Sequence, residues 1–417
     1  MTTTTTPTTP VRLFGNRDYL LWWGGDTGSA LGAAIQGFAL PLVAVLVTGS
    51  VGAGGLVATA YLGAALLLGL PGGVLVDRVD RRQLLAWQAI SGLVVWGVLA
   101  ALVATGSVTT AALAVLAVLG GIRAGLFTSL TNACLQQVVT TEQIPTATSA
   151  NQGRDAVVGL LGSPLGGVLL GFGPAVPFAA AALLSLSTLP AAVGVRASLD
   201  PGRTESASPL ADLREGLVHA WRIPVLRALI SVALLVNLAL GGLLTTVLFT
   251  MLQDGVPGWQ LGLVEGFAGV GMLVGAVAAP TLAHRLRGGL VVPAGLVWIA
   301  LFGSLLALRL DLWQLGLVTG LVGLGVAPVN AIMGGIVTTI VPADKLGRVT
   351  SVAATGAMAL GSLAPALAGW GLTEWGHSPT AIAFVVLLVA GAGLTLASRP
   401  LRTIPTAKDW AGIPLAG

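Results

Sequence analysis

The sequence has little charge and few of the residues from which enzymes build their sites. Only 9% of its 417 residues are charged, against about 25% in soluble domains, which indicates an integral membrane protein. The single cysteine, Cys134, excludes an internal disulfide and a cysteine-based metal cluster. The three histidines do not cluster, and no HExxH, GxSxG or GxxxxGKS/T sequence occurs, which argues against a metal centre, an enzyme and ATP-driven transport.

Long apolar runs make up most of the chain. Twelve of them approach the roughly 20 residues that a helix needs to cross a bilayer. They cover residues 20–47, 55–75, 84–103, 109–127, 151–170, 176–195, 228–251, 261–283, 289–308, 315–337, 350–372 and 380–396. The 59 glycines favour close packing between such helices. The sequence therefore predicts an all-α membrane protein with twelve transmembrane helices.

A polar interval separates the runs into two sets of six. We expect a tail at 1–18, a bundle at 19–195, a linker at 196–227, a second bundle at 228–398 and a tail at 399–417. Helical spacing of apolar residues predicts an amphipathic helix at 210–221 of the linker. Short matches recur at one offset: 75–81 with 282–288, 139–144 with 341–346, and 161–164 with 360–363. They predict two six-helix bundles related as a parallel repeat.

Basic residues gather on one side of the predicted membrane. Nearly all lysines and arginines outside the apolar runs lie on the side of the turn at 78–82, and only Arg309 lies on the other. The positive-inside bias then places both termini and the linker in the cytoplasm. This accounts for the net charge of +4 without a nucleic-acid partner. The expected partners are the bilayer and a small-molecule substrate, and the expected state is a monomer.

The turn between the second and third runs carries a dense charge pattern. It reads Gly73-x-Leu75-x-Asp77-Arg78-x-x-Arg81-Arg82. Such a cluster cannot lie in hydrocarbon and must form a turn at the membrane face. Asp77 can accept hydrogen bonds from the N-terminal end of a neighbouring helix, and the three arginines can pair with acidic groups or phospholipid headgroups. The turn is therefore either a cytoplasmic gate or a topology signal alone.

This pattern resembles the signature between helices 2 and 3 of the major facilitator superfamily, with Asp80 in place of the usual second glycine. Residues 13–22, 210–216 and 341–348 more narrowly resemble a branch of enterobactin-exporter-like and macrolide-efflux-like proteins. The resemblance implies a secondary transporter of a bacterial inner membrane. Such a protein needs no cofactor, draws energy from the proton gradient and works by alternating access of its two bundles.

The fifth run contains a motif of small residues. Its members are Gly159, Gly162, Ser163, Pro164, Gly166 and Gly167. It resembles the Gly-Pro-x-x-Gly-Gly element of proton-driven exporters, with the proline moved by one position. The resemblance implies a proton-coupled exporter of a small hydrophobic or amphipathic compound, such as an antibiotic, a siderophore or another secondary metabolite. Import of a small solute, or a non-transporting sensor on the same scaffold, are the alternatives.

Ionisable groups inside apolar runs are costly unless they are paired or functional. Asp26 and Arg123 are the expected proton-coupling pair, and Arg123 resembles a helix-4 arginine that exporters of the superfamily associate with coupling. A static ion pair or a solvated position is the alternative. Arg154 and Asp155 are expected at the start of helix 5, pointing to different sides of the helix, where they either lie at the membrane interface or link to the turn at 78–82. Glu265 is expected at the outer rim.

Three amides are candidates for the substrate cavity. Gln36, Asn237 and Asn330 lie in the first, seventh and tenth runs, where each could bind substrate or bond a neighbouring helix. Few charged or aromatic side chains remain to line a cavity. This scarcity favours an uncharged or amphipathic substrate that is held mainly by apolar contact.

Overall fold

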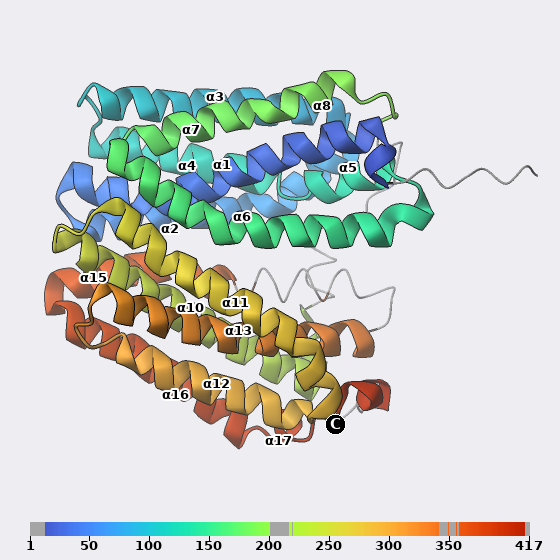
Figure 1. Ribbon diagram of the computed structural model, residues 1–417, viewed down its shortest axis with the longest axis vertical. Coiled ribbons are helices and arrows are strands. Elements are labelled where there is room, and N and C mark those ends of the chain that lie inside the picture. Colours follow the sequence, from blue (N-terminus) through green and yellow to red (C-terminus); the bar gives the residue numbers. More distant parts are fainter. Residues whose placement is uncertain are drawn as a thin grey trace, which may run out of the picture.

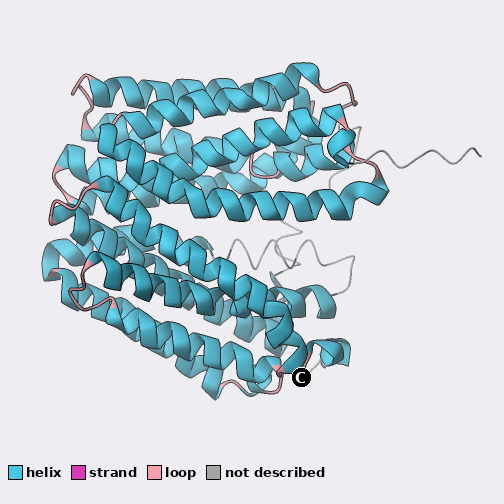
Figure 2. Cartoon of the chain, in the orientation of Figure 1, coloured by secondary structure: helices cyan, strands magenta, loops and turns pink. Residues whose placement is uncertain are grey.

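The computed structural model describes residues 13–200, 217–218, 220–341, 349, 356 and 358–412. All regular elements in these ranges are helical (Figures 1 and 2). The first half contains η1 (Leu13–Gly15), α1 (Arg17–Thr48), α2 (Val51–Arg78), α3 (Arg81–Ala104), α4 (Thr110–Leu126), α5 (Leu130–Val138), η2 (Thr141–Gln143), α6 (Ile144–Phe172), α7 (Val176–Ser185), η3 (Leu186–Thr188) and α8 (Leu189–Gly194). The second contains α10 (Pro224–Gln253), α11 (Gly258–Arg285), α12 (Gly288–Leu305), α13 (Leu312–Ile340), α15 (Ala364–Trp375), α16 (His377–Ala397), α17 (Arg399–Arg402) and η4 (Ala407–Gly412).

Eleven helical segments of the described chain are long and apolar enough to cross a membrane. They correspond in order to all of the predicted runs except the eleventh. Of that run, α15 is the main described part, and much of 350–363 lies outside the described residues. The structure therefore has the predicted all-helical, two-bundle architecture.

The two bundles lie side by side, with α1–α8 in the upper half of Figure 1 and α10–α17 in the lower half. The turns α1–α2, α3–α4, α6–α7 and α10–α11 lie at the left, and we name this side the α1–α2 end. The turns α2–α3 and α11–α12 lie at the right, together with the C-terminus, and we name this side the α2–α3 end. Helix α6 packs against α11 across the bundle boundary, and α2 packs against α15.

Contacts between the bundles are tightest near the α1–α2 end. A Cβ atom added to Gly55 of α2 would lie 2.1 Å from the Pro365 carbonyl oxygen of α15. One added to Gly167 of α6 would lie 2.4 Å from the Gly258 carbonyl oxygen of α11. Nearer the α2–α3 end of α6, Gly153 has nothing within 4 Å of the same position. The helices thus close against one another at one end of the membrane.

Two spans differ most from their predicted limits. Helix α6 begins at Ile144 rather than 151, because the Thr140–Gln143 capping box and a proline in the first turn start it earlier than the apolar pattern does. The fourth span continues past its predicted end at 127. Helix α4 stops there, but after a three-residue break the chain re-enters helix as α5 and the span reaches Val138.

The predicted polar turn at 73–82 is mostly helical. Helix α2 runs through Arg78 and α3 starts at Arg81, so only Val79 and Asp80 form the turn. Asp80 caps α3 by accepting a hydrogen bond from the Arg82 backbone N–H at 2.8 Å. Most of the predicted amphipathic helix at 210–221, and nearly all of the match at 341–346, lie outside the described residues.

Candidate functional site

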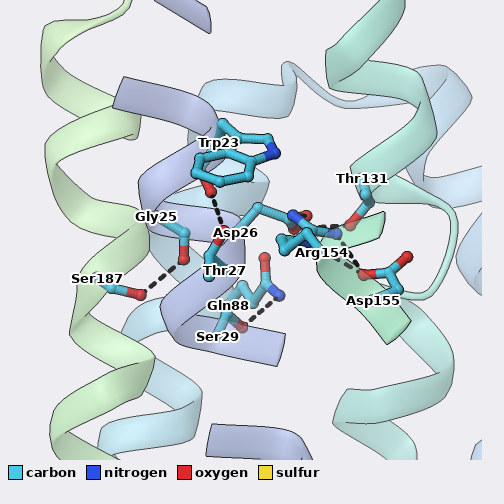
Figure 3. Close-up of polar contacts among 10 residues, drawn as sticks. All are labelled: Trp23, Gly25, Asp26, Thr27, Ser29, Gln88, Thr131, Arg154, Asp155 and Ser187. Carbon is cyan, nitrogen blue, oxygen red and sulfur yellow. Dashed lines mark hydrogen bonds and ion pairs between the residues drawn. The ribbon is translucent and has the colours of Figure 1, made fainter. Parts of the chain in front are cut away.

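A buried ion pair lies inside the first bundle. Asp26 stands nine residues into α1, about 14 Å along the helix axis, and is 8% exposed. Its carboxylate pairs with the guanidinium of Arg154 on α6, which is 7% exposed, and accepts a hydrogen bond from the Thr131 hydroxyl of α5 at 2.8 Å (Figure 3). Three helices therefore meet at one carboxylate in the interior of the bundle.

Arg154 also binds its neighbour in sequence. Its Nε and Nη2 donate to Asp155 Oδ1 at 3.0 and 2.7 Å (Figure 3). The two residues do face different surroundings, as predicted, but the expected interfacial place of Arg154 is wrong, because α6 begins earlier than predicted and Arg154 pairs with Asp26 inside the bundle. The Asp155 side chain is 59% exposed, whereas that of Arg154 is 4% exposed. The cluster of two acids and one base thus runs from the bundle interior to an exposed carboxylate.

Arg123 does not pair with Asp26. Its Nε and Nη2 donate to the Gln88 carbonyl oxygen on α3 at 3.2 and 3.1 Å. The Gln88 side-chain amide donates to the Ser29 hydroxyl at 3.2 Å, one turn beyond Asp26 on α1 (Figure 3). The predicted pair is therefore corrected to Asp26 with Arg154. Sequence reasoning could not choose between the two arginines, since both lie in apolar runs and only packing decides which one reaches α1.

Close packing sets the direction of Asp26. A Cβ atom at Gly25 would lie 2.6 Å from the Ser187 carbonyl oxygen, and one at Gly28 would lie 2.4 Å from the Ser187 hydroxyl. The Ser187 hydroxyl donates to the Gly25 carbonyl oxygen at 2.7 Å (Figure 3). Because the glycine face of α1 is held against η3, the adjacent Asp26 side chain points away from η3 toward α5 and α6.

The arginines of the α2–α3 region bind backbone carbonyls in the described chain. Arg82 donates to the carbonyl oxygens of Ala192 at 2.9 Å and Val195 at 2.7 Å, which are orphan acceptors at the end of α8. Arg81 donates to the Ala133 carbonyl oxygen of α5 at 3.4 Å. Among the described residues, Arg81 and Arg82 therefore join helices of one bundle and form no ion pair with an acidic side chain, and their contact with phospholipid headgroups stays a prediction.

The remaining residues of this motif lie on the last turns of α2. They are Gly73, Leu75, Asp77 and Arg78. Asp77 is exposed, and within the described residues its carboxylate makes no hydrogen bond or ion pair. Its predicted role at a neighbouring helix stays a prediction.

The small-residue motif at 159–167 lies on α6 and has two packed faces. Gly162 and Gly166 press on α1, where added Cβ atoms would lie 2.4 Å from Ala34 Cβ and 2.9 Å from Phe38. Ser163, Pro164 and Gly167 face α11. Gly159 has open space around it. The motif thus holds α6 between its own bundle and the other one.

The three amides have different surroundings. Gln36 is 1% exposed and donates to the Tyr61 hydroxyl of α2 at 3.0 Å, so it bonds a neighbouring helix. Asn237 is exposed and donates to the Ala233 carbonyl oxygen of its own helix at 2.8 Å. Asn330 is exposed on α13. Contact of any of them with a substrate stays a prediction.

A cavity of about 240 Å³ lies between α10 and α13 toward the α2–α3 end. Its lining is almost entirely apolar and includes Leu226, Leu229, Ile230, Met333, Val337 and Thr338. Sequence analysis missed it, because apolar side chains facing a cavity and those facing lipid follow the same pattern. Such a cavity suits an uncharged group far better than an ion.

Comparison with known proteins gives consistent matches. The family model described as Major Facilitator Superfamily matches residues 25–290. Proteins described as multidrug efflux pump Tap, from Mycobacterium bovis and Mycobacterium tuberculosis, are 27% identical over 402 residues, covering 91% of this chain and 93% of theirs.

Solved structures agree in fold. The nucleoside transporter NupG matches with a TM-score of 0.68 at 13% identity, over 92% of this chain and 99% of its own. A bacterial homologue of the iron transporter ferroportin in an inward-facing state matches with a TM-score of 0.64 at 17% identity, over 95% and 98%.

Proposed function

The chain belongs to the major facilitator superfamily, whose members are transporters rather than enzymes, and from this premise we propose that it is a proton-coupled exporter of small hydrophobic or amphipathic compounds. The observation that carries the proposal is the Asp26–Arg154–Asp155 cluster within the membrane-spanning helices, in which Asp26 and Arg154 are buried and Asp155 is exposed. Ionisable groups inside membrane-spanning segments are rare and commonly mark proton or ion pathways.

The proposed orientation places the α2–α3 end in the cytoplasm of a bacterial inner membrane. The described arginines at that end are Arg17, Arg78, Arg81, Arg82, Arg196, Arg222, Arg227, Arg285, Arg287, Arg399 and Arg402. At the α1–α2 end, Arg309 accompanies the acids Asp254, Asp311 and Glu374. This asymmetry supports the positive-inside assignment. The tight contacts between the bundles then lie on the outer side.

We propose that Arg154 exchanges partners during coupling. With Asp26 ionised, the guanidinium bridges a buried and an exposed carboxylate. Protonation of Asp26 removes its charge and leaves Arg154 to Asp155 alone, so the contact between α1 and α6 weakens. Because Asp155 is exposed, it can pass a proton between solvent and the buried site. Arg123 is a positioning residue in this scheme, through Gln88 and Ser29.

The apolar cavity and the relatives support export of an uncharged or amphipathic compound. The mycobacterial relatives are described as multidrug efflux pumps, and we propose the same kind of activity for this chain. The cavity opens in the half of the protein nearer the proposed cytoplasmic side, where an exporter must collect its substrate. Asn237 and Asn330 are proposed to contribute hydrogen bonds.

The test uses cells of a pump-deficient bacterial host preloaded with Nile red, an uncharged lipophilic dye. We expect the wild-type chain to accelerate dye efflux, and collapse of the proton gradient to abolish the acceleration. Asp26→Asn should reduce proton-driven efflux at least tenfold. Faster dye accumulation on expression would indicate import, and gradient-independent efflux or unchanged coupling in Asp26→Asn would contradict the mechanism. Arg309→Gln, which breaks an exposed pair, is the matched control.

The proposed gate needs a separate variant. Asp77→Asn should abolish efflux while membrane insertion remains normal, because the change removes an anion from the end of α2 without altering its packing. Normal efflux in this variant would leave the α2–α3 turn as a topology signal only.

A further inference from the structure

Glu265 is not at the outer rim, as expected from sequence, but on the α11 face that packs against the other bundle. Its neighbours at one turn before and one residue after, Gly262 and Gly266, both contact α6. A Cβ atom at Gly262 would lie 2.4 Å from the Ser163 carbonyl oxygen, and one at Gly266 would lie 2.9 Å from Pro164 Cγ. The partly buried Glu265 carboxyl interacts with the Ser163 hydroxyl across this boundary.

No basic side chain of the described residues balances this carboxyl. Helices α6, α10, α12 and α13 pack against α11. Their charged residues, and those of α11 itself, lie near the α2–α3 end of the molecule: Arg154, Asp155, Arg227, His284 and Arg285. The charged residues at the caps of these helices are Asp254, Arg287 and Asp311. The charged residues of η4, which also contacts α11, are Lys408 and Asp409. Within the part of the chain that the structure describes, the Ser163 hydroxyl is the polar partner of Glu265.

The second boundary between the bundles has no comparable group. Where α2 meets α15 near the α1–α2 end, the contacts come from glycines, Pro365 and the Thr59 hydroxyl, which accepts from the Ala366 backbone N–H at 3.1 Å. Glu374 of α15 is exposed at the end of its helix. Among the described residues, Glu265 is therefore the ionisable side chain built into the closure.

Protonation decides whether this closure is compatible with Glu265. A neutral carboxylic acid can sit in a close-packed, apolar boundary at little cost. A carboxylate there can accept a hydrogen bond from the Ser163 hydroxyl, but without a cation this one bond does not replace its lost hydration. Separation of α6 from α11 would admit water and restore that hydration. We infer that Glu265 is a proton-binding site whose occupancy closes the α1–α2 end and whose deprotonation favours opening of that end.

The closed state holds one more proton at Glu265 than the open state, so lowering the pH favours closure of the α1–α2 end. The ratio of closed to open molecules can change by up to about tenfold per pH unit where the two states differ by one proton. This site differs from the Asp26 cluster, which lies within one bundle.

The experiment measures the distance between two spin labels in lipid nanodiscs by pulsed electron paramagnetic resonance. Thr110→Cys and Leu308→Cys place labels on exposed positions at the α1–α2 ends of different bundles, in a Cys134→Ala background. From pH 5 to pH 8 we expect the closed-to-open ratio to fall at least tenfold. Glu265→Gln should change less than twofold over the same range and stay closed, since the amide mimics the neutral acid.

Two further variants sharpen the outcome. Glu374→Gln changes an exposed acid at the same end and should keep the wild-type pH response. Ser163→Ala removes a hydrogen bond that favours the Glu265 carboxylate, so it should move the midpoint to higher pH, and it keeps the inference testable if Glu265→Gln does not fold. A pH-independent ratio in the parent, a wild-type response in Glu265→Gln, or an unmoved midpoint in Ser163→Ala would overturn the inference. No substrate is added, so failure here is distinct from failure of the proposed export.

Discussion

The interiors of the two bundles bury different kinds of polar group. In the first bundle, the buried polar side chains include an ion pair and two amides, contributed by Asp26, Arg154, Gln36 and Asn151. In the described part of the second bundle they are hydroxyls only: Thr246, Thr250, Thr319, Ser362, Thr380 and Thr395. Each of these donates to a carbonyl oxygen of its own helix or the turn before it.

The difference corresponds to the two tasks that our proposal assigns to this transporter, proton binding and substrate binding. Thr246, Ser362, Thr380 and Thr395 bond only within their own helix or turn, whereas the Thr319 hydroxyl also lies 3.0 Å from the Val264 carbonyl oxygen of α11 and the Thr250 hydroxyl lies 2.9 Å from the His377 ring nitrogen of α16. A hydroxyl that bonds within its own helix needs no partner from another helix. The apolar cavity lies in that bundle, between α10 and α13. The Asp26–Arg154 ion pair, by contrast, lies where α1, α5 and α6 meet, and it is the group that we propose to respond to protons. In the described residues, the first bundle therefore buries charge, whereas the second contains an apolar cavity.

The largest effect is expected from breaking the ion pair. Arg154→Met leaves Asp26 as an unpaired buried anion at neutral pH, which costs about 3–5 kcal/mol. Protonation of Asp26 removes that charge, so the variant should regain stability as the pH falls, unlike the wild type. Thermal unfolding of detergent-solubilised protein at pH 5 and pH 8 checks this. A stability loss that is equal at both pH values would contradict the assignment of Asp26 as its cause.

The α2–α3 region offers the next comparison, because the match of 75–81 with 282–288 pairs Arg82 with Gly289. Arg82 uses its guanidinium to bind the end of α8, whereas Gly289 donates its backbone N–H to the Ile404 carbonyl oxygen at 2.9 Å. Arg82→Gln should lower stability by about 1.5–3 kcal/mol, as expected for hydrogen bonds from a charged group.

Two other variants test that comparison. Gly289→Ala places a Cβ atom 2.0 Å from the Arg402 carbonyl oxygen and should also destabilise the protein. Arg17→Gln, at an exposed arginine of the same end, should change stability by less than about 0.5 kcal/mol. Equal losses in Arg82→Gln and Arg17→Gln would show that charge at this end matters and the carbonyl contacts do not.

The apolar character of the second bundle is tested by filling its cavity. Gly334 lines the cavity, and a Cβ atom there meets nothing within 4 Å, so Gly334→Leu should fold and occupy the space. The half-saturating Nile red concentration for efflux should rise about tenfold, equivalent to ~1.4 kcal/mol. Gly393→Leu on α16, which also meets open space, is the matched control and should leave it unchanged. An unchanged value in both would remove the cavity from the substrate path.

The smallest effect is expected at the exposed pair of Arg309 with Asp254. Its N–O distance is 2.8 Å, but the two side chains are 65% and 50% exposed. Solvent screening limits such pairs to about 0–1 kcal/mol. Arg309→Gln should therefore shift the unfolding midpoint by a small amount that added salt also removes. A loss as large as that of Arg154→Met would mean that burial does not distinguish the two pairs.

The fold was largely predictable because a bilayer imposes long apolar helices and a charge bias on the sequence itself. The site was predicted less completely. Asp26 was singled out because an acid in an apolar run is rare, but its partner was taken to be Arg123 rather than Arg154. The error has its cause in α6, which begins at Ile144 with polar turns. The apolar pattern predicted a start at 151, so Arg154 was expected at the membrane interface and not in the bundle interior.

The amino-acid sequence alone determined the class of protein, the order of its helices and the positions of its intramembrane charges, because these depend on local hydropathy and spacing. Only the tertiary structure decided which arginine meets Asp26, that Arg82 binds carbonyls and that Glu265 lies between the bundles. Those facts depend on how helices far apart in sequence rotate and pack. The close approach of helices at glycine positions sets that rotation.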